Sequence, residues 1–155
     1  MAPAQEFLVP SADHAINEKF QFKLTATLPA STDHAYDYYD TYAVCFKDTL
    51  SEGITYDGPD SVVIKSNNNT YNITDTLKYT INTDNLETQN YFEVNIPDVK
   101  TCAEGLDLND GATITVTYTA HLNEKAYVNI ESGSTDNKNS VQLKYSNNPR
   151  PGDYW

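Results

Sequence analysis

Asn139 and Asp48 are the two side chains of this sequence best placed to do chemistry. Asn139 opens a run of alternating parity, and the apolar residues on its own parity are Val141, Leu143 and Tyr145. A β-strand points successive side chains to opposite faces, so this pattern turns the asparagine toward a core. A buried carboxamide is costly unless it is hydrogen-bonded, which suggests a chemical purpose for Asn139.

Asp48 lies at the end of another expected strand, on the parity of Val44 and Phe46. It therefore faces the core or its rim, where loss of water should raise its pKa and keep it protonated. A protonated acid beside a carboxamide polarises the carbonyl and relays protons. A lysine kept neutral by the same burial can attack that carbonyl and expel ammonia, which leaves an internal amide cross-link without any cofactor.

Both residues also have simpler interpretations. Asp48 can accept hydrogen bonds from the backbone amides of residues 49–51, where the strand turns. Asn139 follows Asn137 and Lys138, and this Asn-rich stretch is typical of a turn. From these patterns alone, Asp48 and Asn139 can each have either a structural or a chemical role.

The elements that would position these side chains are short strands. Tyr, Thr and Val recur in alternating runs that Asn, Asp, Gly and Pro interrupt, which is typical of all-β proteins. About nine to ten strands at this spacing predict an Ig-like sandwich of two antiparallel sheets. The expected strands are 20–28, 41–48, 60–65, 70–73, 77–81, 90–96, 112–122, 126–130 and 141–146, and a helical turn or loop is expected at 99–109.

The chain of 155 residues is long enough for one domain with a substantial core. We expect residues 1–16 to form an N-terminal arm or leading strand, 17–149 the β-sandwich, and 150–155 the start of a linker. No apolar run has the length of a transmembrane helix, and the first ten residues lack the features of a signal peptide. These features fit a piece of a longer exported protein.

The overall charge and the missing motifs exclude several classes of function. The formal net charge of −12 argues against nucleic acid and anionic membranes as partners, because both bind through clustered Lys and Arg. The GxSxG, GxxxxGK and GxGxxG motifs are absent, so turnover of an external substrate and a cofactor have no support. The three histidines are dispersed and no Cys pair has zinc spacing, so no metal site is expected.

Cysteines and tyrosines supply two further possibilities. Cys45 and Cys102 can form one disulfide in an exported domain, or remain two buried thiols, and the sequence does not decide between these states. Tyr36, Tyr38 and Tyr39 fall in one polar connection and can stack on sugars or contact a partner protein. The alternative is that these tyrosines simply cover the end of the sandwich.

Four segments resemble the backbone domains of sortase-assembled pilins of Gram-positive bacteria, which form isopeptide bonds and have a collagen-adhesin-like fold. The segments are FQFKLTATLP (20–29), DTLSEGITY (48–56), GATITVTYTAHL (111–122) and NSVQLKYSNNP (139–149). They occur in the family's order, and the resemblance spans residues 17 to 149. It implies that Asp48 is the acid that promotes the cross-link and that Asn139 is the cross-linked carboxamide.

The same resemblance places the family's lysine in a first strand, which corresponds here to residues 4–13. That segment contains no lysine. Lys19 and Lys23 are the nearest, but both have the parity of the outward-facing residues of 20–28. We therefore expect the intramolecular bond to be absent, and an open site could instead receive a lysine-bearing strand from another chain.

The resemblance implies an extracellular structural domain of a surface pilus or cell-wall-anchored protein, whose partners are other pilin subunits and sortase. It does not imply an enzyme, beyond autocatalytic formation of the bond. The alternative function is an adhesin module of the same fold that binds a host protein or glycan, with the tyrosine connection as its contact surface.

Overall fold

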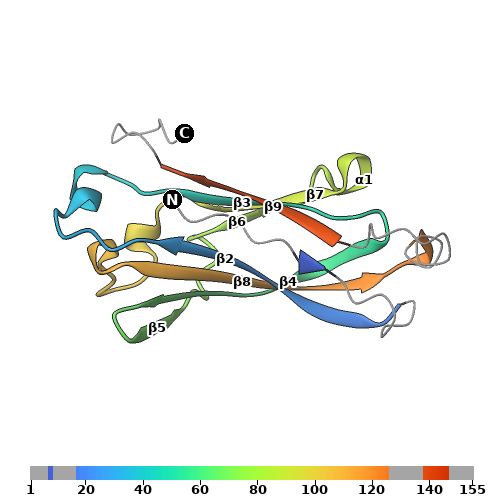
Figure 1. Ribbon diagram of the computed structural model, residues 1–155, viewed down its shortest axis with the longest axis horizontal. Helices are drawn as coiled ribbons and strands as arrows, with labels where there is room; N and C mark the ends of the chain where they lie inside the picture. The colour runs from blue at the N-terminus through green and yellow to red at the C-terminus, as the bar shows by residue number, and fades with distance from the viewer. Residues whose placement is uncertain (1–6, 9–16, 126–137, 147–155) are drawn as a thin grey trace.

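The structure, a computed structural model, describes residues 7–8, 17–125 and 138–146, which form two β-sheets packed face to face (Figure 1). One sheet has five strands in the order β1-β9-β3-β7-β6, and the other has four in the order β2-β8-β4-β5. Every pair of neighbouring strands is antiparallel. The prediction of an all-β, two-sheet antiparallel sandwich is confirmed.

The described residues contain nine strands and four short helical segments. The strands are β1 (Phe7–Leu8), β2 (Lys19–Leu28), β3 (Val44–Thr49), β4 (Ile54–Ser66), β5 (Asn69–Asn72), β6 (Thr80–Asn82), β7 (Tyr91–Ile96), β8 (Ala112–Leu122) and β9 (Lys138–Tyr145). The helical segments are η1 (Ala35–Tyr38), α1 (Leu86–Gln89), η2 (Val99–Thr101) and η3 (Leu108–Asp110).

The sandwich is built on the long ladder between β2 and β8. Lys19 pairs with His121 and Leu28 with Ala112, and the register does not shift between these ends. Alternate residues of both strands are buried and the others face outward, so each strand presents one apolar face to the core. The largest fully buried side chains come from both sheets and from η2: Tyr118, Phe46, Phe92, Leu24, Leu28, Ile64, Ile96, Ile114, Leu122, Val44, Val94 and Val99.

Four expected strands differ from the observed ones by more than one residue. The segment 60–65 is only the second half of β4, because register shifts near Gly58 and Pro59 let the strand continue through residues that usually end one. The segment 41–48 is ordered as a strand only from Val44, and 77–81 is displaced to β6. The last of them, 141–146, begins earlier, at Lys138 of β9, because β9 continues to pair with β1 and β3 there. The expected strand 126–130 and the linker 150–155 lie outside the described residues.

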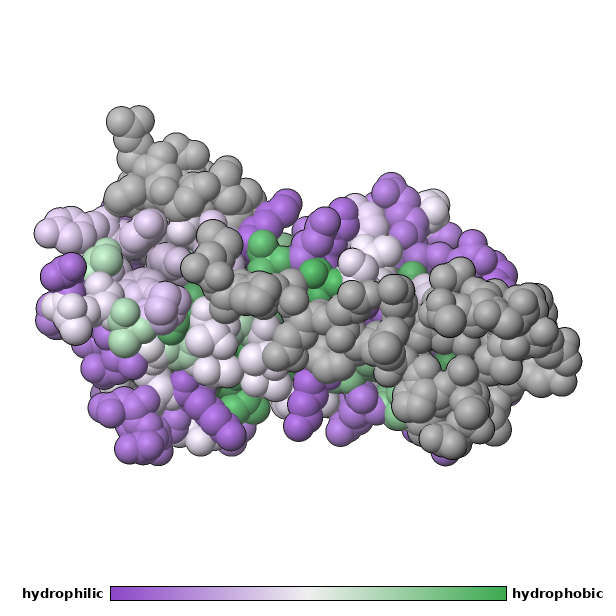
Figure 2. Space-filling model, viewed as in Figure 1, coloured by the Kyte–Doolittle hydropathy of each residue, from purple (hydrophilic) through white to green (hydrophobic). Residues whose placement is uncertain are grey.

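The described surface is mainly polar. On the face drawn in Figure 2, hydrophobic residues appear only in small, separate patches. The large apolar side chains that are strongly exposed are Tyr38 and Leu77. No helix among the described residues is long and apolar enough to cross a membrane.

Candidate functional site

Three strands bring Asp48, Tyr118 and Asn139 together between the sheets. Asp48 on β3 pairs with Val141 of β9, so Asn139 lies two residues further along β9 on the same inward face. Tyr118 belongs to β8 of the opposite sheet and points inward with its apolar neighbours. All three side chains are completely buried, with no exposed surface.

The hydroxyl of Tyr118 joins the acid to the carboxamide. It donates to Oδ2 of Asp48 at 2.5 Å and accepts a hydrogen bond from Nδ2 of Asn139, also at 2.5 Å. Because β8 lies in one sheet and β3 and β9 in the other, these bonds tie the two layers together across the core. Oδ1 of Asp48 and Oδ1 of Asn139 are buried without a hydrogen-bond partner among the described residues.

Burial dominates the electrostatics of this group. It raises the pKa of Asp48 from 3.8 to about 7, although the hydrogen bonds from Tyr118 and Asn139 act in the opposite direction. Burial, and then the neighbouring Asp48 charge, raises the pKa of Tyr118 far above its ordinary value, so this hydroxyl stays neutral. The two Oδ1 atoms of Asp48 and Asn139 have no donor among the described residues. When Asp48 is protonated, its O–H group supplies one such donor.

Three aromatic rings pack around the Tyr118 ring. The Tyr118 ring stacks on Phe22 at 5.2 Å between centroids, meets Phe92 edge-on at 5.0 Å and lies 5.5 Å from Tyr56. Such packing fixes the ring, and with it the hydroxyl that orients Asp48 and Asn139. The ring packing therefore helps to hold the acid and the carboxamide in place through this hydroxyl.

Removing the hydroxyl of Tyr118 tests this bridge. Tyr118→Phe leaves Oδ2 of Asp48 and Nδ2 of Asn139 buried without their shared partner, so we expect the free energy of unfolding to fall by about 3 kcal/mol. Urea unfolding measures this change. Tyr56→Phe is the matched control, because the buried Tyr56 hydroxyl has no hydrogen-bond partner within the described part of the chain and its removal should cost almost nothing. Equal stability of the two variants would contradict the bridge.

The backbone opposite Asn139 is that of Phe7. In the pairing of β1 with β9, Phe7 faces Asn139 and Leu8 faces Lys138. Residues directly opposite each other in an antiparallel pair share one face of the sheet, so position 7 is the nearest place from which a first strand could deliver an amine. Lys19 and Lys23 lie on β2 of the other sheet with exposed side chains, away from the site.

Cys45 and Cys102 are both free thiols in the structure. Cys45 is buried on β3, 3.6 Å from the Glu93 carboxylate, and Cys102 ends η2. Burial, followed by a neighbouring carboxylate, raises the pKa of Cys45 to about 12 and that of Cys102 to about 11. Both are therefore protonated and unreactive at neutral pH.

The tyrosine connection is ordered by its own contacts. Tyr36 is buried and packs edge-on against Tyr42 at 5.0 Å, and Tyr39 does the same at 5.1 Å. The Lys100 ammonium donates to the backbone carbonyls of Tyr36 at 2.9 Å and Tyr39 at 2.6 Å. Tyr38 alone of the three predicted contact residues is strongly exposed, at 74%.

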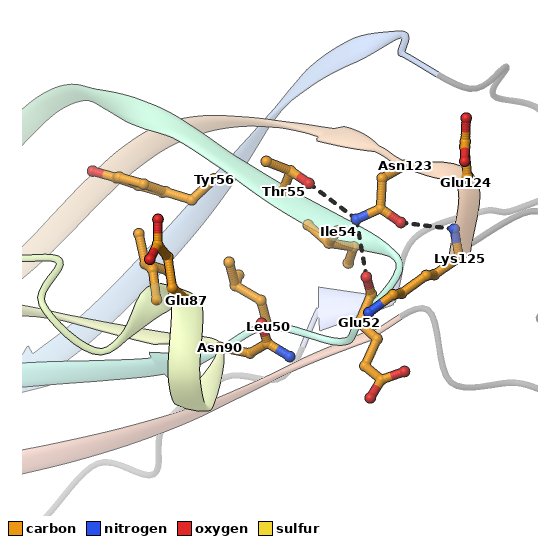
Figure 3. Close-up of a pocket in the computed structure, with 11 residues that line it drawn as sticks. Leu50, Glu52, Ile54, Thr55, Tyr56, Glu87, Asn90, Asn123, Glu124 and Lys125 are labelled. Atoms are coloured by element: carbon orange, nitrogen blue, oxygen red, sulfur yellow. Dashed lines mark hydrogen bonds between the residues drawn. The ribbon is translucent and has the colours of Figure 1, made fainter.

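A pocket of about 490 Å³ opens at one end of the sandwich (Figure 3). Leu50, Ile54 and Leu86 give it an apolar floor, and Asn123 closes one side by donating to the carbonyl of Glu52. Tyr56 lines the pocket, and its ring centroid lies 5.5 Å from that of Tyr118. Three or more His, Cys, Asp or Glu side chains in metal-binding geometry do not occur among the described residues.

Sequence reasoning identified Asp48 and Asn139 as inward-facing but assigned no role to Tyr118. Its position inside the apolar face of β8 was visible, and a tyrosine hydroxyl in such a run needs a polar partner. That requirement is the signal that could have linked Tyr118 to the two other polar residues predicted to face the core.

No protein-family model and no curated protein matches the chain. Several solved structures are similar to the chain. The pilus 2b backbone protein of group B streptococcus superposes with a TM-score of 0.59 at 20% identity, over 96% of this chain and 53% of that one. The major pilin SpaD of Corynebacterium diphtheriae gives 0.62 at 19% identity, over 95% of this chain and 31% of that one.

A collagen-binding domain has the same architecture. That of the Erysipelothrix rhusiopathiae surface protein RspB gives a TM-score of 0.55 at 20% identity, over 94% of this chain and 40% of that one. The chain thus spans about half or less of the length of these three proteins. It has the fold shared by Gram-positive pilin backbone domains and collagen-binding adhesin domains.

Proposed function

We propose that the chain is a structural domain of a cell-surface pilus or cell-wall-anchored protein, related to domains that form Lys–Asn isopeptide bonds but without that bond. The supporting observation is the buried group of Asp48, Tyr118 and Asn139 with Phe7 opposite Asn139. An acid and a carboxamide are held together in the buried core, and the residue that pairs with Asn139 on β1 is not a lysine.

The place of the site in the fold fits a mechanical role. β1 and β9 come from opposite ends of the described chain and are neighbours at one edge of the five-stranded sheet. Tension on the two ends of the domain therefore loads this pair early. In this proposal the Tyr118 bridge ties the sheets at the point where related domains would have a covalent link.

Location and partners follow from the same proposal. The domain acts outside the cell, its neighbours are other pilin subunits, and a sortase joins those subunits. No turnover of an external substrate is assigned to it. The fold shared with pilus backbone proteins supports this assignment.

The intact mass of the purified chain tests the proposal. We expect the mass calculated from the sequence, identical under reducing and non-reducing conditions, because no lysine stands opposite Asn139 and both thiols are free. Formation of one Lys–Asn bond would lower the mass by about 17 Da through loss of ammonia. A deficit of that size in the unmodified chain would contradict the absence of the bond.

A second candidate function is an adhesin module for a host matrix protein or glycan. The observation that favours it is the strongly exposed Tyr38, carried on a segment that Lys100 holds in place. Tyrosines at such positions often dominate binding. If this function is correct, the Tyr38→Ala variant should bind a matrix-protein or glycan array at least about tenfold more weakly. Leu77→Ala, which removes another exposed apolar side chain, should leave binding unchanged.

A further inference from the structure

We propose that the pocket drawn in Figure 3 binds an arginine side chain, together with a nearby aliphatic side chain, from an extended segment of a partner protein. The pocket lies at one end of the sandwich, and its lining includes none of the residues Asp48, Tyr118 and Asn139. Binding there does not depend on the proposed function.

The floor of the pocket is the edge of the hydrophobic core. Leu50 and Ile54 belong to that core, and Leu86 of α1 packs against it. The volume of about 490 Å³ is in the range of cavities that bind small organic ligands, so the pocket has room for more than one side chain. Aliphatic groups that cover this floor leave water, which stabilises the complex.

Hydrogen bonds between separate segments hold the walls of the pocket. The Leu50 amide donates to the carbonyl of Asn90 at 2.7 Å, and Asn90 ends α1 with a φ of 58°. The Asn123 amide donates to the carbonyl of Gly53 at 2.9 Å, and its side chain donates to the carbonyl of Glu52, also at 2.9 Å. The walls are therefore formed without a ligand, and binding requires little further ordering of the chain.

The rim of the pocket carries more negative than positive charge. Glu52, Glu87 and Glu124 line it and are exposed, whereas the one cation among the described lining residues is Lys125. Figure 3 shows the Lys125 side chain extending toward Glu52, with Glu87 beside Tyr56 at the opposite end. The end with Glu87 therefore combines a carboxylate with an aromatic ring and is the place for a cation from a ligand.

Arginine fits this arrangement better than the other basic side chains. Its aliphatic stem can cover the floor, while its planar guanidinium donates two hydrogen bonds to the Glu87 carboxylate and contacts the Tyr56 ring. Lysine has a compact charge and no planar face, so it should bind more weakly.

The charges also indicate where the arginine comes from. A free amino acid would bring its α-carboxylate close to Glu52 and Glu124, which repel it, whereas a residue within a peptide chain lacks that charge. A second copy of this chain has the same net charge of −12, which opposes self-association. The occupant is therefore a segment of a different protein. Side chains two positions apart share a face of an extended segment, so its pattern is aliphatic-x-Arg.

NMR titration of the isotope-labelled full chain with the peptide Gly-Leu-Ser-Arg-Gly, blocked at both ends, tests this site. We expect saturable shifts of the backbone amides of Leu50, Leu86 and Glu87. Citrulline in place of arginine keeps the shape but removes the charge, and should weaken binding about tenfold. Equal binding of the citrulline peptide, or no saturable shift at these amides up to about 10 mM peptide, would overturn the proposal.

A matched pair of chain variants isolates the carboxylate. Glu87→Gln should weaken binding of the arginine peptide about tenfold and leave binding of the citrulline peptide unchanged, because it removes only the charge. Glu104→Gln is the control, since Glu104 is also exposed but does not line the pocket. Equal effects of the two substitutions would overturn the proposal.

Two further measurements separate the other possible occupants. Free arginine should bind more weakly than the peptide, and equal or tighter binding would show that the pocket takes a free amino acid. Shifts of the same amides that grow with protein concentration, without any peptide, would show that a second copy fills the pocket. Either result would overturn the assignment to a partner protein.

Discussion

Replacing Phe7 by lysine is expected to convert this chain into a self-cross-linked protein, about 17 Da lighter than the mass calculated for the variant. Position 7 lies directly opposite Asn139 in the ladder of β1 and β9, so a lysine there emerges on the face that Asn139 shares with Asp48. Burial lowers the pKa of an amine, so the lysine enters the site in its neutral, nucleophilic form. Every other component of the reaction is already present.

The bond should have a large effect on stability. It would join residues 7 and 139 and so close a loop that includes most of the chain. Closing a loop of that length lowers the entropy of the unfolded chain by an amount worth about 5 kcal/mol. For a domain of this size we expect the melting temperature to rise by about 10 to 20 °C. Intact mass and differential scanning calorimetry measure the two effects.

The matched control is Phe7→Met, which introduces an unbranched side chain of similar length without an amine. It should show neither the mass deficit nor the gain in melting temperature. Adding Asn139→Ala to Phe7→Lys should abolish the bond, and adding Asp48→Ala should do the same, since Asp48 relays the proton. A Phe7→Lys protein that folds and keeps its full calculated mass would show that Asp48 and Asn139 are only structural.

Alternation along strands predicted much of this site. Val44, Phe46 and Asp48 share one face of β3, and the buried position of Asn139 follows from the same rule in β9. These inferences succeed because two-fold periodicity is a local property of the sequence. The strand β8, from Ala112 to Leu122, was predicted to the residue for the same reason.

What could not be predicted depends on how strands meet in space. The pairing of Phe7 with Asn139 joins residues from opposite ends of the chain, and no local pattern fixes that register. The bridging role of Tyr118 depends on two sheets facing each other. The strand predicted at 60–65 is too short, because bulges near Gly58 and Pro59 let β4 begin at Ile54 and run beside β8, and such bulges are a feature of strand pairing.

Asp48 should make the stability of the protein depend on pH in a direction opposite to that of most acidic residues. Burial raises its pKa to about 7 in the folded chain, compared with the ordinary value of 3.8. Between these values the folded chain holds a proton that the unfolded chain has released, so the free energy of unfolding falls as the pH rises. The stabilising contribution is complete below about pH 4 and lost above about pH 7, a change of about 4 kcal/mol.

The variant Asp48→Asn separates this contribution from all other titrating groups. Its carboxamide cannot ionise, but it keeps an oxygen that can accept from Tyr118 and adds an N–H donor to a site with two unpaired oxygens. We expect the variant and the parent to be about equally stable at pH 4. At pH 8 the variant should be more stable by up to about 4 kcal/mol.

Urea unfolding of both proteins across this range measures the difference between their pH profiles. Profiles that run parallel from pH 4 to pH 8 would mean that Asp48 has the same pKa in the folded and the unfolded chain. Divergence in the expected direction would show that the folded core favours the neutral acid. That is the form that polarises a carboxamide, so the same titration determines at which pH the Phe7→Lys variant can cross-link. Its cross-linking rate should therefore decline above about pH 7, where Asp48 loses its proton.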